Sequence, residues 1–132
     1  MLDTDIASYL IKSRDRKLEA HFRTIHPSSV CLSMISRAEL MYGLKKLPLN
    51  HRLHVDVPFF LKIVRALPWD AKAADNYAEI RHLLTTKGQI IDDPDMMIAA
   101  HAISAGAILV TNNTRHYSRI SLPLVLENWT RH

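Results

Sequence analysis

The sequence predicts an α/β fold in which a parallel sheet is covered by helices on both faces. Short apolar runs, such as VCLSMI at 30–35 and AILVT at 107–111, alternate with longer segments of helical periodicity. Strands that alternate with helices pair in parallel, because each helix carries the chain back to the starting edge of the sheet. The 132 residues contain no repeat, low-complexity stretch or linker, which indicates a single domain over 1–132.

Five segments are expected to form a strand or to contain one. They lie at 1–2, 30–35, 65–69, 107–111 and 124–129. The first would be a very short strand, and a turn at 27–29 would precede the second.

Six segments are expected to be helical, because their apolar residues recur at helical spacing and residues that typically begin or end helices lie at their ends. They lie at 5–12, 16–25, 36–47, 51–64, 71–86 and 95–105. Asp70 is expected to cap the fifth helix, whereas Gly88 and Gly106 would end the fifth and the sixth. Pro58 would kink or divide the fourth.

The composition indicates a soluble protein with a mild preference for nucleic acid. Hydrophobic residues make up 48% and charged residues 23%, and the net charge of +4 makes RNA or DNA a somewhat favoured partner. The longest apolar runs fall short of the ~20 residues that a membrane span needs. The single cysteine, Cys31, lies in a strand-like run and predicts a buried thiol in a reducing compartment. We therefore expect a cytoplasmic protein with no membrane association.

Acidic and amide side chains recur at one edge of the predicted sheet. They are Asp3, Thr4 and Asp5 after the first strand, Glu39 after the second, Asp95 at the start of the helix before the fourth, and Thr111, Asn112 and Asn113 after the fourth. In sheets of this kind the working site lies beyond the carboxyl ends of the strands. The pattern therefore predicts one polar site built from segments far apart in the sequence.

Each of these residues also has a purely structural explanation. Asp3 or Thr4 could cap the first helix, and Glu39 could complete a capping box with Ser36. In DDPD at 92–95, Asp93 could be the N-cap with Pro94 at the first helical position. The asparagines are ordinary turn residues.

A bound divalent cation would explain all the carboxylates with a single cause. Two carboxylates about 4 Å apart repel each other by roughly 4 kcal/mol at an effective dielectric constant near 20. A cation between them removes that cost. Hard oxygen ligands, without the Cys and His spacing of a zinc site, favour Mg²⁺ or Mn²⁺.

Four motifs in this chain resemble the PIN domain, in particular the VapC toxins of bacterial toxin–antitoxin pairs. In chain order they are MLDTDIASYL, ISRAELMYG, PDMMIAAHA, and LVTNNTRHY with ENW after it. The resemblance runs essentially end to end. It implies a metal-dependent endoribonuclease built on a parallel sheet of about five strands flanked by helices. It further implies Asp3, Glu39 and Asp95 as the core acids, with Asn113 in the fourth position and with Asp3 and Asp95 as metal ligands.

The resemblance also implies a homodimer, an antitoxin that neutralises the enzyme, and a structured RNA substrate, commonly tRNA. Thr111 and Asn112 would help to position water or phosphate, and Arg115 and Arg119 could contact the RNA backbone. Two positions depart from the family pattern. Asp5 stands where relatives usually carry Asn, which adds negative charge to the pocket. His116 lies where close relatives often carry Glu.

The segment at 51–64 is more apolar than one buried helix face requires. The residues concerned are Val55, Phe59, Phe60, Ile63 and Val64. They could supply a dimer surface, a groove for the antitoxin, or plain core.

Three other functions fit the sequence less well. A non-catalytic RNA- or protein-binding PIN-like module would not need the acids that are present here. A haloacid-dehalogenase-like phosphatase also begins with D-x-D, but it needs Thr where this chain has Ala7. A metal-free, histidine-based ribonuclease would need paired histidines, whereas the eight in this chain are scattered.

Overall fold

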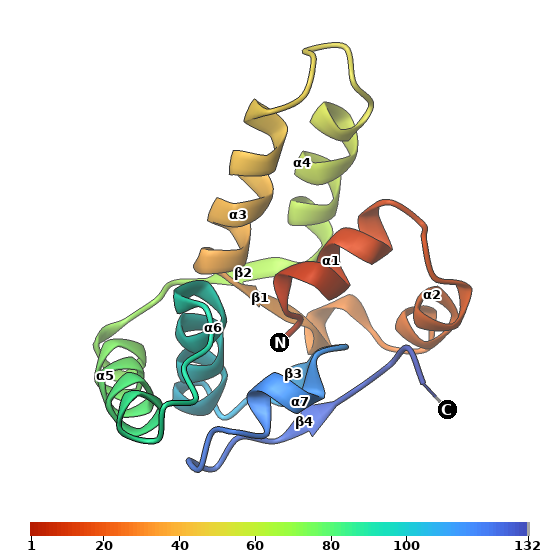
Figure 1. The fold of residues 1–132 in the computed structure, drawn as a ribbon. Coiled ribbons are helices and arrows are strands. Elements are labelled where there is room, and N and C mark those ends of the chain that lie inside the picture. Colours follow the sequence, from red (N-terminus) through yellow and green to blue (C-terminus); the bar gives the residue numbers. More distant parts are fainter. Residues whose placement is uncertain (132) are drawn as a thin grey trace.

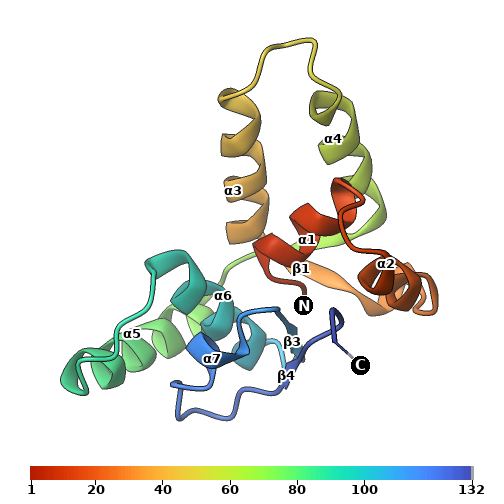
Figure 2. The ribbon, with the colours of Figure 1, turned by 45° about the vertical axis from the view of Figure 1, so that its right-hand side comes forward.

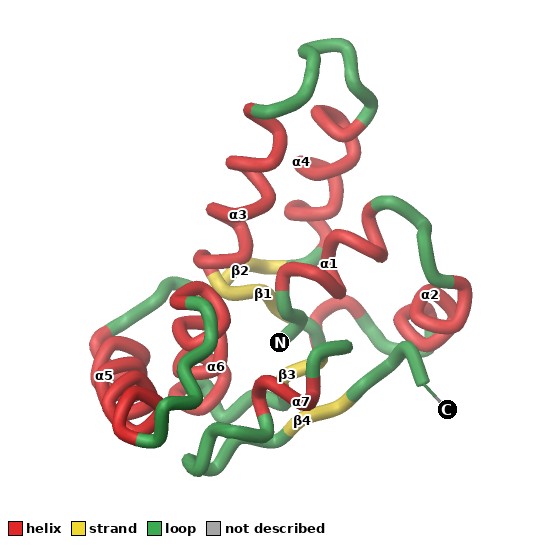
Figure 3. The backbone as a smooth tube through the Cα atoms, viewed as in Figure 1, coloured by secondary structure: helices red, strands yellow, loops and turns green. Residues whose placement is uncertain are grey.

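The computed structural model describes residues 1–131 and confirms the α/β class, with short parallel strands among helices (Figures 1 and 3). In chain order the elements are α1 Thr4–Ile11, α2 Arg16–Arg23, the 3₁₀ turn η1 Pro27–Ser29, β1 Cys31–Ser33, α3 Met34–Lys45, α4 Leu53–Ile63, β2 Arg65–Leu67, α5 Ala71–Thr86, α6 Asp93–Ser104, β3 Leu109–Val110, α7 Thr114–Tyr117 and β4 Leu126–Glu127.

The segment at 1–3 joins two pairs of parallel strands. β1 pairs with β2, and β3 pairs with β4. The Leu2 N–H donates to the Cys31 carbonyl at 3.0 Å, and Leu2 forms a parallel bridge with Val110. The strands thus follow the order β2, β1, Leu2, β3, β4. Four of the five expected strands form within residues 1–131, and the first is reduced to the bridge at Leu2.

Helices cover both faces of the strands. Along the extended chain, side chains alternate between faces. Leu2 and Val110 accordingly belong to a core with α1, α2, α3 and α4, whereas Met1 and Leu109 belong to a core with α5, α6 and α7. Figure 2 shows the same division, with the α3–α4 pair projecting from the strands and α5 beside α6. The predicted sandwich is therefore confirmed.

Two helix starts differ from prediction, and both lie near the acidic residues. α3 begins at Met34 with Ser33 as N-cap, so the proposed capping box of Ser36 with Glu39 is wrong, and Glu39 falls in the second turn. α6 begins at Asp93 with Asp92 as N-cap, so Asp93 is not the cap. In each case the sequence offered several polar residues within one turn, and capping propensity does not choose between them.

Several other local features differ from or add to the sequence-based expectations. α4 runs unbroken through Pro58, and α7 was not foreseen. Cys31 is partly exposed rather than buried. His101 is buried, and its Nδ1 lies 2.8 Å from Ser33 Oγ, which ties α6 to the end of β1. Within residues 1–131, every helix is too short or too polar to cross a membrane.

Stability is expected to depend on the packing of α5 against α6. Leu84, 1% exposed, is in the core on that side of the sheet. Leu84→Ala should lower the free energy of unfolding by about 2–5 kcal/mol, since it leaves a cavity. Leu49→Ala is the control, because Leu49 is 91% exposed and surface changes usually stay within about 0.5 kcal/mol. Urea denaturation followed by circular dichroism measures both, and equal losses would contradict this packing.

Candidate active site

Carboxylates gather where the parallel strands end. Asp3 follows Leu2, Glu39 projects from α3, and Asp95 lies in the first turn of α6. The negative charges are close enough to act on one another, because Asp95 raises the pKa of both Asp3 and Glu39. The structure thus brings together the three core acids expected from the sequence.

Asp3 is the most constrained of the three. Its Oδ1 accepts a hydrogen bond from the Ile6 N–H at 2.8 Å, so it caps α1 as the structural explanation supposed. Burial raises the pKa of Asp3 to about 6, although hydrogen bonds from Thr111 and Ile6 oppose the rise. The carboxylates of Asp5 and Asp95 add to it. Capping and site membership are therefore compatible roles for this residue.

Glu39 is held by α1. Thr4 Oγ1 donates to Glu39 Oε1 at 2.6 Å and lies 3.0 Å from the buried Ser36 Oγ. Burial raises the pKa of Glu39, and three neighbouring carboxylates raise it further, those of Asp95, Asp5 and Asp92. Thr4, which itself contacts Ser36, thus orients one carboxylate oxygen of Glu39.

Asp95 faces a buried tyrosine. Burial raises the pKa of Asp95, and the Tyr117 hydroxyl lowers it. The same hydroxyl is the one buried side-chain polar atom within 1–131 that lacks a hydrogen-bond partner of good geometry. Tyr117 is 1% exposed, and burial together with the Asp95 and Asp3 carboxylates raises its pKa. This hydroxyl therefore stays protonated and can only donate toward the acids.

The two asparagines have different surroundings. Asn113 Nδ2 lies 2.8 Å from His116 Nδ1, and His116 opposes the rise that burial causes in the pKa of Asp95, so this pair borders the acids. Asn112 Oδ1 instead accepts hydrogen bonds from Asn128 and Thr130 near the chain end. The structure brings Asn113 and His116 to the site and gives Asn112 a role in holding the C-terminal segment.

The two arginines follow the Asn113 turn. Arg115 lies in α7 and is exposed, whereas Arg119 lies two residues beyond α7 and is half-buried.

Asp92 and Tyr117 are site residues that the sequence reasoning missed. Asp92 is the N-cap of α6 yet makes no capping hydrogen bond, and it raises the pKa of Asp95 and Glu39. The crowded acids of DDPD were a signal for Asp92. Nothing in the sequence indicated Tyr117, because its hydroxyl reaches the acids only through the path of α7.

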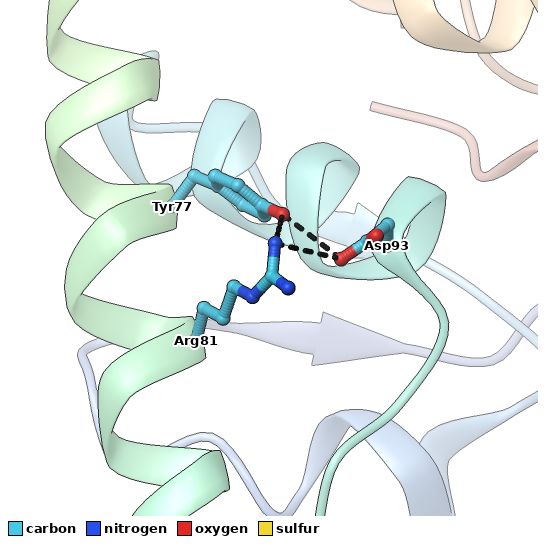
Figure 4. A network of polar contacts seen from close by, with 3 residues as sticks. All are labelled: Tyr77, Arg81 and Asp93. Atoms are coloured by element: carbon cyan, nitrogen blue, oxygen red, sulfur yellow. Dashed lines mark hydrogen bonds and ion pairs between the residues drawn. The ribbon is translucent and has the colours of Figure 1, made fainter.

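Asp93 belongs to a different network (Figure 4). Tyr77 donates to Asp93 Oδ1 at 2.9 Å, Arg81 Nη1 donates to the Tyr77 hydroxyl at 2.9 Å, and Arg81 lies 3.7 Å from Asp93. All three side chains are on α5 or at the start of α6. The Arg81–Asp93 contact is the only ion pair within residues 1–131. Asp93 is thereby turned toward α5.

Five other acids near the strand ends form no ion pair within residues 1–131, and they are Asp3, Asp5, Glu39, Asp92 and Asp95. Carboxylate oxygens are the ligands that Mg²⁺ and Mn²⁺ prefer. In the described conformation, no three Asp, Glu, His or Cys side chains within 1–131 converge closely enough to hold an ion. The chemistry of the set fits a divalent cation, because these carboxylates lie close enough to raise one another's pKa values and have no basic side chain to neutralise them.

Ionisation of the buried Asp3 carboxylate is unfavourable, so Asp3→Asn is expected to stabilise the metal-free protein. The pKa of Asp3 rises from 3.8 to about 6 on folding, so its contribution to stability falls as the pH rises through this interval and stays lost above it. Asparagine keeps the cap on α1 without the charge. The metal-free variant should therefore be more stable at pH 7.5 by about 1–3 kcal/mol, with little difference at pH 4. Urea denaturation at both pH values measures this, and an equal effect at both would contradict it.

Comparisons with known proteins agree over nearly the whole chain. The PIN domain family model matches residues 1–121. The chain is 37% identical over 129 residues to ribonuclease VapC2 of Haemophilus influenzae, covering 98% of this chain and 96% of the relative. It is 35% identical over 130 residues to the tRNA(fMet)-specific endonuclease VapC of Shigella flexneri, covering 98% and 97%.

Solved structures show the same fold. The crystal structure of VapBC2 from Rickettsia felis, bound to a DNA fragment from its promoter, matches with a TM-score of 0.89 and 35% identity, covering 98% of this chain and 97% of that one. DNA-bound VapBC from Salmonella typhimurium matches with a TM-score of 0.89 and 35% identity, covering 98% and 96%. A haloacid-dehalogenase fold is thereby excluded. The chain belongs to the PIN-domain family and, within it, to the VapC group.

Proposed function

We propose that this protein is a divalent-metal-dependent endoribonuclease toxin that cleaves structured RNA, with tRNA favoured, and is neutralised by a VapB-like antitoxin. The observation that carries this proposal is the set of carboxylates without a basic partner where the parallel strands end. Relatives that match along the whole chain bear the names ribonuclease and endonuclease.

Asp3 and Asp95 are the residues that would hold Mg²⁺ or Mn²⁺. When bound, the ion supplies a more acidic water and neutralises charge on the phosphate. Asp3 is fixed by its cap on α1, whereas Asp95 is fixed by α6 and faces the Tyr117 hydroxyl. These contacts support both carboxylates as ligands of the ion.

Glu39 and Asn113 would act on water and phosphate. Thr4 holds one oxygen of Glu39, so the other can orient the attacking water. Asn113, beside His116, offers an uncharged side chain that can bind water or a phosphoryl oxygen without adding to the repulsion. Attack by water at phosphorus would leave 5′-phosphate and 3′-hydroxyl ends.

The proposal of an RNA substrate rests on the name of a relative and on the charge of this chain. The relative from Shigella flexneri is named as specific for tRNA(fMet), and this chain carries a net charge of +4 although five acids gather in one site. The rest of the surface is therefore more basic than the total suggests, which favours a polyanionic ligand. Arg115 and Arg119, which follow Asn113 in the chain and are exposed and half-buried, would contact the RNA backbone.

An apolar groove between α1, α2 and α4 is the proposed binding site of the antitoxin. Its volume is about 540 Å³, and Leu10, Phe22, Phe59, Phe60 and Ile63 line it. Phe60 and Val64 are buried core, whereas Val55, Phe59 and Ile63 are 72%, 64% and 44% exposed. The apolar surplus of this segment is thus partly core and partly surface. A helix of the antitoxin can cover the exposed part, and an arginine from it can enter the acidic site and displace the metal. Self-association through Phe59 and Ile63 is the competing use.

Asp95→Asn should reduce Mg²⁺-dependent cleavage of a tRNA transcript by at least about 100-fold, because it removes a ligand charge. EDTA should abolish cleavage by the unmodified protein, and added Mg²⁺ should restore it. Asp75→Asn, an exposed position on α5, is the matched control and should keep full activity. Full activity of Asp95→Asn would refute the mechanism, and RNA binding without cleavage by the unmodified protein would favour a non-catalytic module.

Mg²⁺ binding should weaken in mild acid. Protons compete with the metal for Asp3, whose pKa is about 6 without metal. Lowering the pH from 7.5 to 5.5 should weaken the affinity by about fourfold through Asp3 alone, and by more if Glu39 and Asp95 titrate with it. Isothermal titration calorimetry at the two pH values checks this. An affinity that does not change would contradict the placement of the ion at Asp3.

Phe59→Asp should weaken antitoxin binding strongly while leaving cleavage of tRNA unchanged, because it places a charge on the apolar groove. Val125→Asp is the control, since Val125 is 58% exposed and lies outside the groove. Pull-down of the purified antitoxin gives the first readout and the RNase assay the second. Tight binding by Phe59→Asp would remove the groove from the proposal.

A further inference from the structure

A second groove lies beside the acidic site, and its lining includes both acidic and basic side chains. It lies between α1, α3 and the start of α4 and encloses about 550 Å³. In Figures 1 and 2, α1 lies near the base of the projecting α3–α4 pair. Its lining includes Thr4, Asp5 and Glu39 together with Lys12, Arg14, Lys46 and Arg52. Because Asp5 and Lys12 lie at the two ends of α1, and Glu39 and Lys46 about two turns apart along α3, we assign the acids to one end of the groove and the cations to the other. From Asp5 to Lys12 the groove follows α1 for about 10 Å.

The four cations at the far end are free to bind an anion. The only ion pair within residues 1–131 is Arg81–Asp93, so none of them has an acidic partner. Arg14, Lys46 and Arg52 are exposed. The Lys46 ammonium lies 4.5 Å from the centre of the Tyr42 ring, which orients it without neutralising its charge.

The floor of the groove is apolar and kept open. Leu40, Leu44 and Leu53 form part of it. Gly43 also lines the groove from within α3, where glycine is a poor helix former. A Cβ at Gly43 would meet no atom within 4 Å, so packing does not require glycine there. The missing side chain instead leaves room in the groove.

From these features we propose that this groove binds the single-stranded RNA segment next to the scissile phosphate. The cationic end would hold backbone phosphates and the apolar floor would contact bases, which is the combination that suits single-stranded nucleic acid. The inference rests on the proposed nuclease function. RNA is favoured over a protein partner because the groove is lined by Asp5 and Glu39, which neighbour the proposed metal ligands Asp3 and Asp95, whereas the apolar groove around Phe59 shares only Ile11 with it.

The first experiment measures binding apart from cleavage. The probe is a labelled initiator tRNA transcript, bound to the full chain carrying Asp95→Asn so that it stays intact. Adding Lys46→Gln and Arg52→Gln should weaken binding at 0.15 M salt by about fourfold for each charge, and lower the salt slope by about 0.7 for each lost phosphate contact. Lys72→Gln with Lys87→Gln, both exposed near the ends of α5, is the matched control and should change neither.

A steric variant provides an independent test. Gly43→Leu fills the groove with a good helix former and should weaken tRNA binding severalfold without loss of folding. Gly43→Ala is its control and should bind nearly as well as the parent. Circular dichroism confirms folding of each variant.

The outcomes separate this inference from the nuclease proposal. Unchanged affinity and salt slope in the groove variants would overturn the groove assignment even if the enzyme cleaves RNA. Loss of antitoxin binding with unchanged RNA affinity would assign the groove to the antitoxin and also overturn it. Failure of the unmodified protein to cleave RNA would instead refute the nuclease function, whatever the binding results.

Discussion

The pairing of the segment at 1–3 between β1 and β3 is the constraint on which the site depends. Leu2 bonds to Cys31 on one side, and the Asp3 N–H bonds to the Val110 carbonyl at 3.0 Å on the other. These few hydrogen bonds join two strand pairs that otherwise have no common strand. They also set the depth of Asp3 where the strands end, so the first helix begins inside the site.

In this arrangement, the carboxylates proposed for function reduce the stability of the folded protein. Burial and neighbouring carboxylates raise the pKa values of Asp3, Glu39 and Asp95, which means that their ionised forms are less favourable in the folded protein than in water. A fold selected for stability alone would neutralise or pair them. Their persistence without a basic partner is the physical reason to expect a cation, and a mobile arginine from a partner could meet the same demand.

Acidic and basic side chains are separated along the direction of α1. The acids stand where the strands end, and unpaired cations stand about 10 Å away along α1. A polyanion is repelled by the first group unless metal is present and attracted by the second. Metal and RNA would therefore favour each other's binding, because each reduces the electrostatic cost that the other meets. The modest net charge conceals this separation, since the two groups nearly cancel in the total.

Much of the molecule followed from local patterns. The alternation of strands and helices predicted the parallel sheet, and polar residues after the strands predicted that Asp3, Glu39 and Asp95 would meet. Helix starts were less well determined, because Ser33 and Ser36, or Asp92 and Asp93, are equally good caps by composition. Tyr117 was not foreseen, since its contact with Asp95 depends on where a short, unexpected helix places it.

The sequence by itself determined the order of the strands and of the six longer helices, the edge of the sheet at which the acids appear, and the family. The periodicity of apolar residues and the polar residues that follow strands are local properties, and both can be recognised in a single sequence. Only the tertiary structure decided which acid of DDPD turns away to Arg81, which asparagine borders the site, and where the cations of α1, α3 and α4 form one groove. Those outcomes depend on the relative placement of segments many residues apart, and no local pattern encodes that placement.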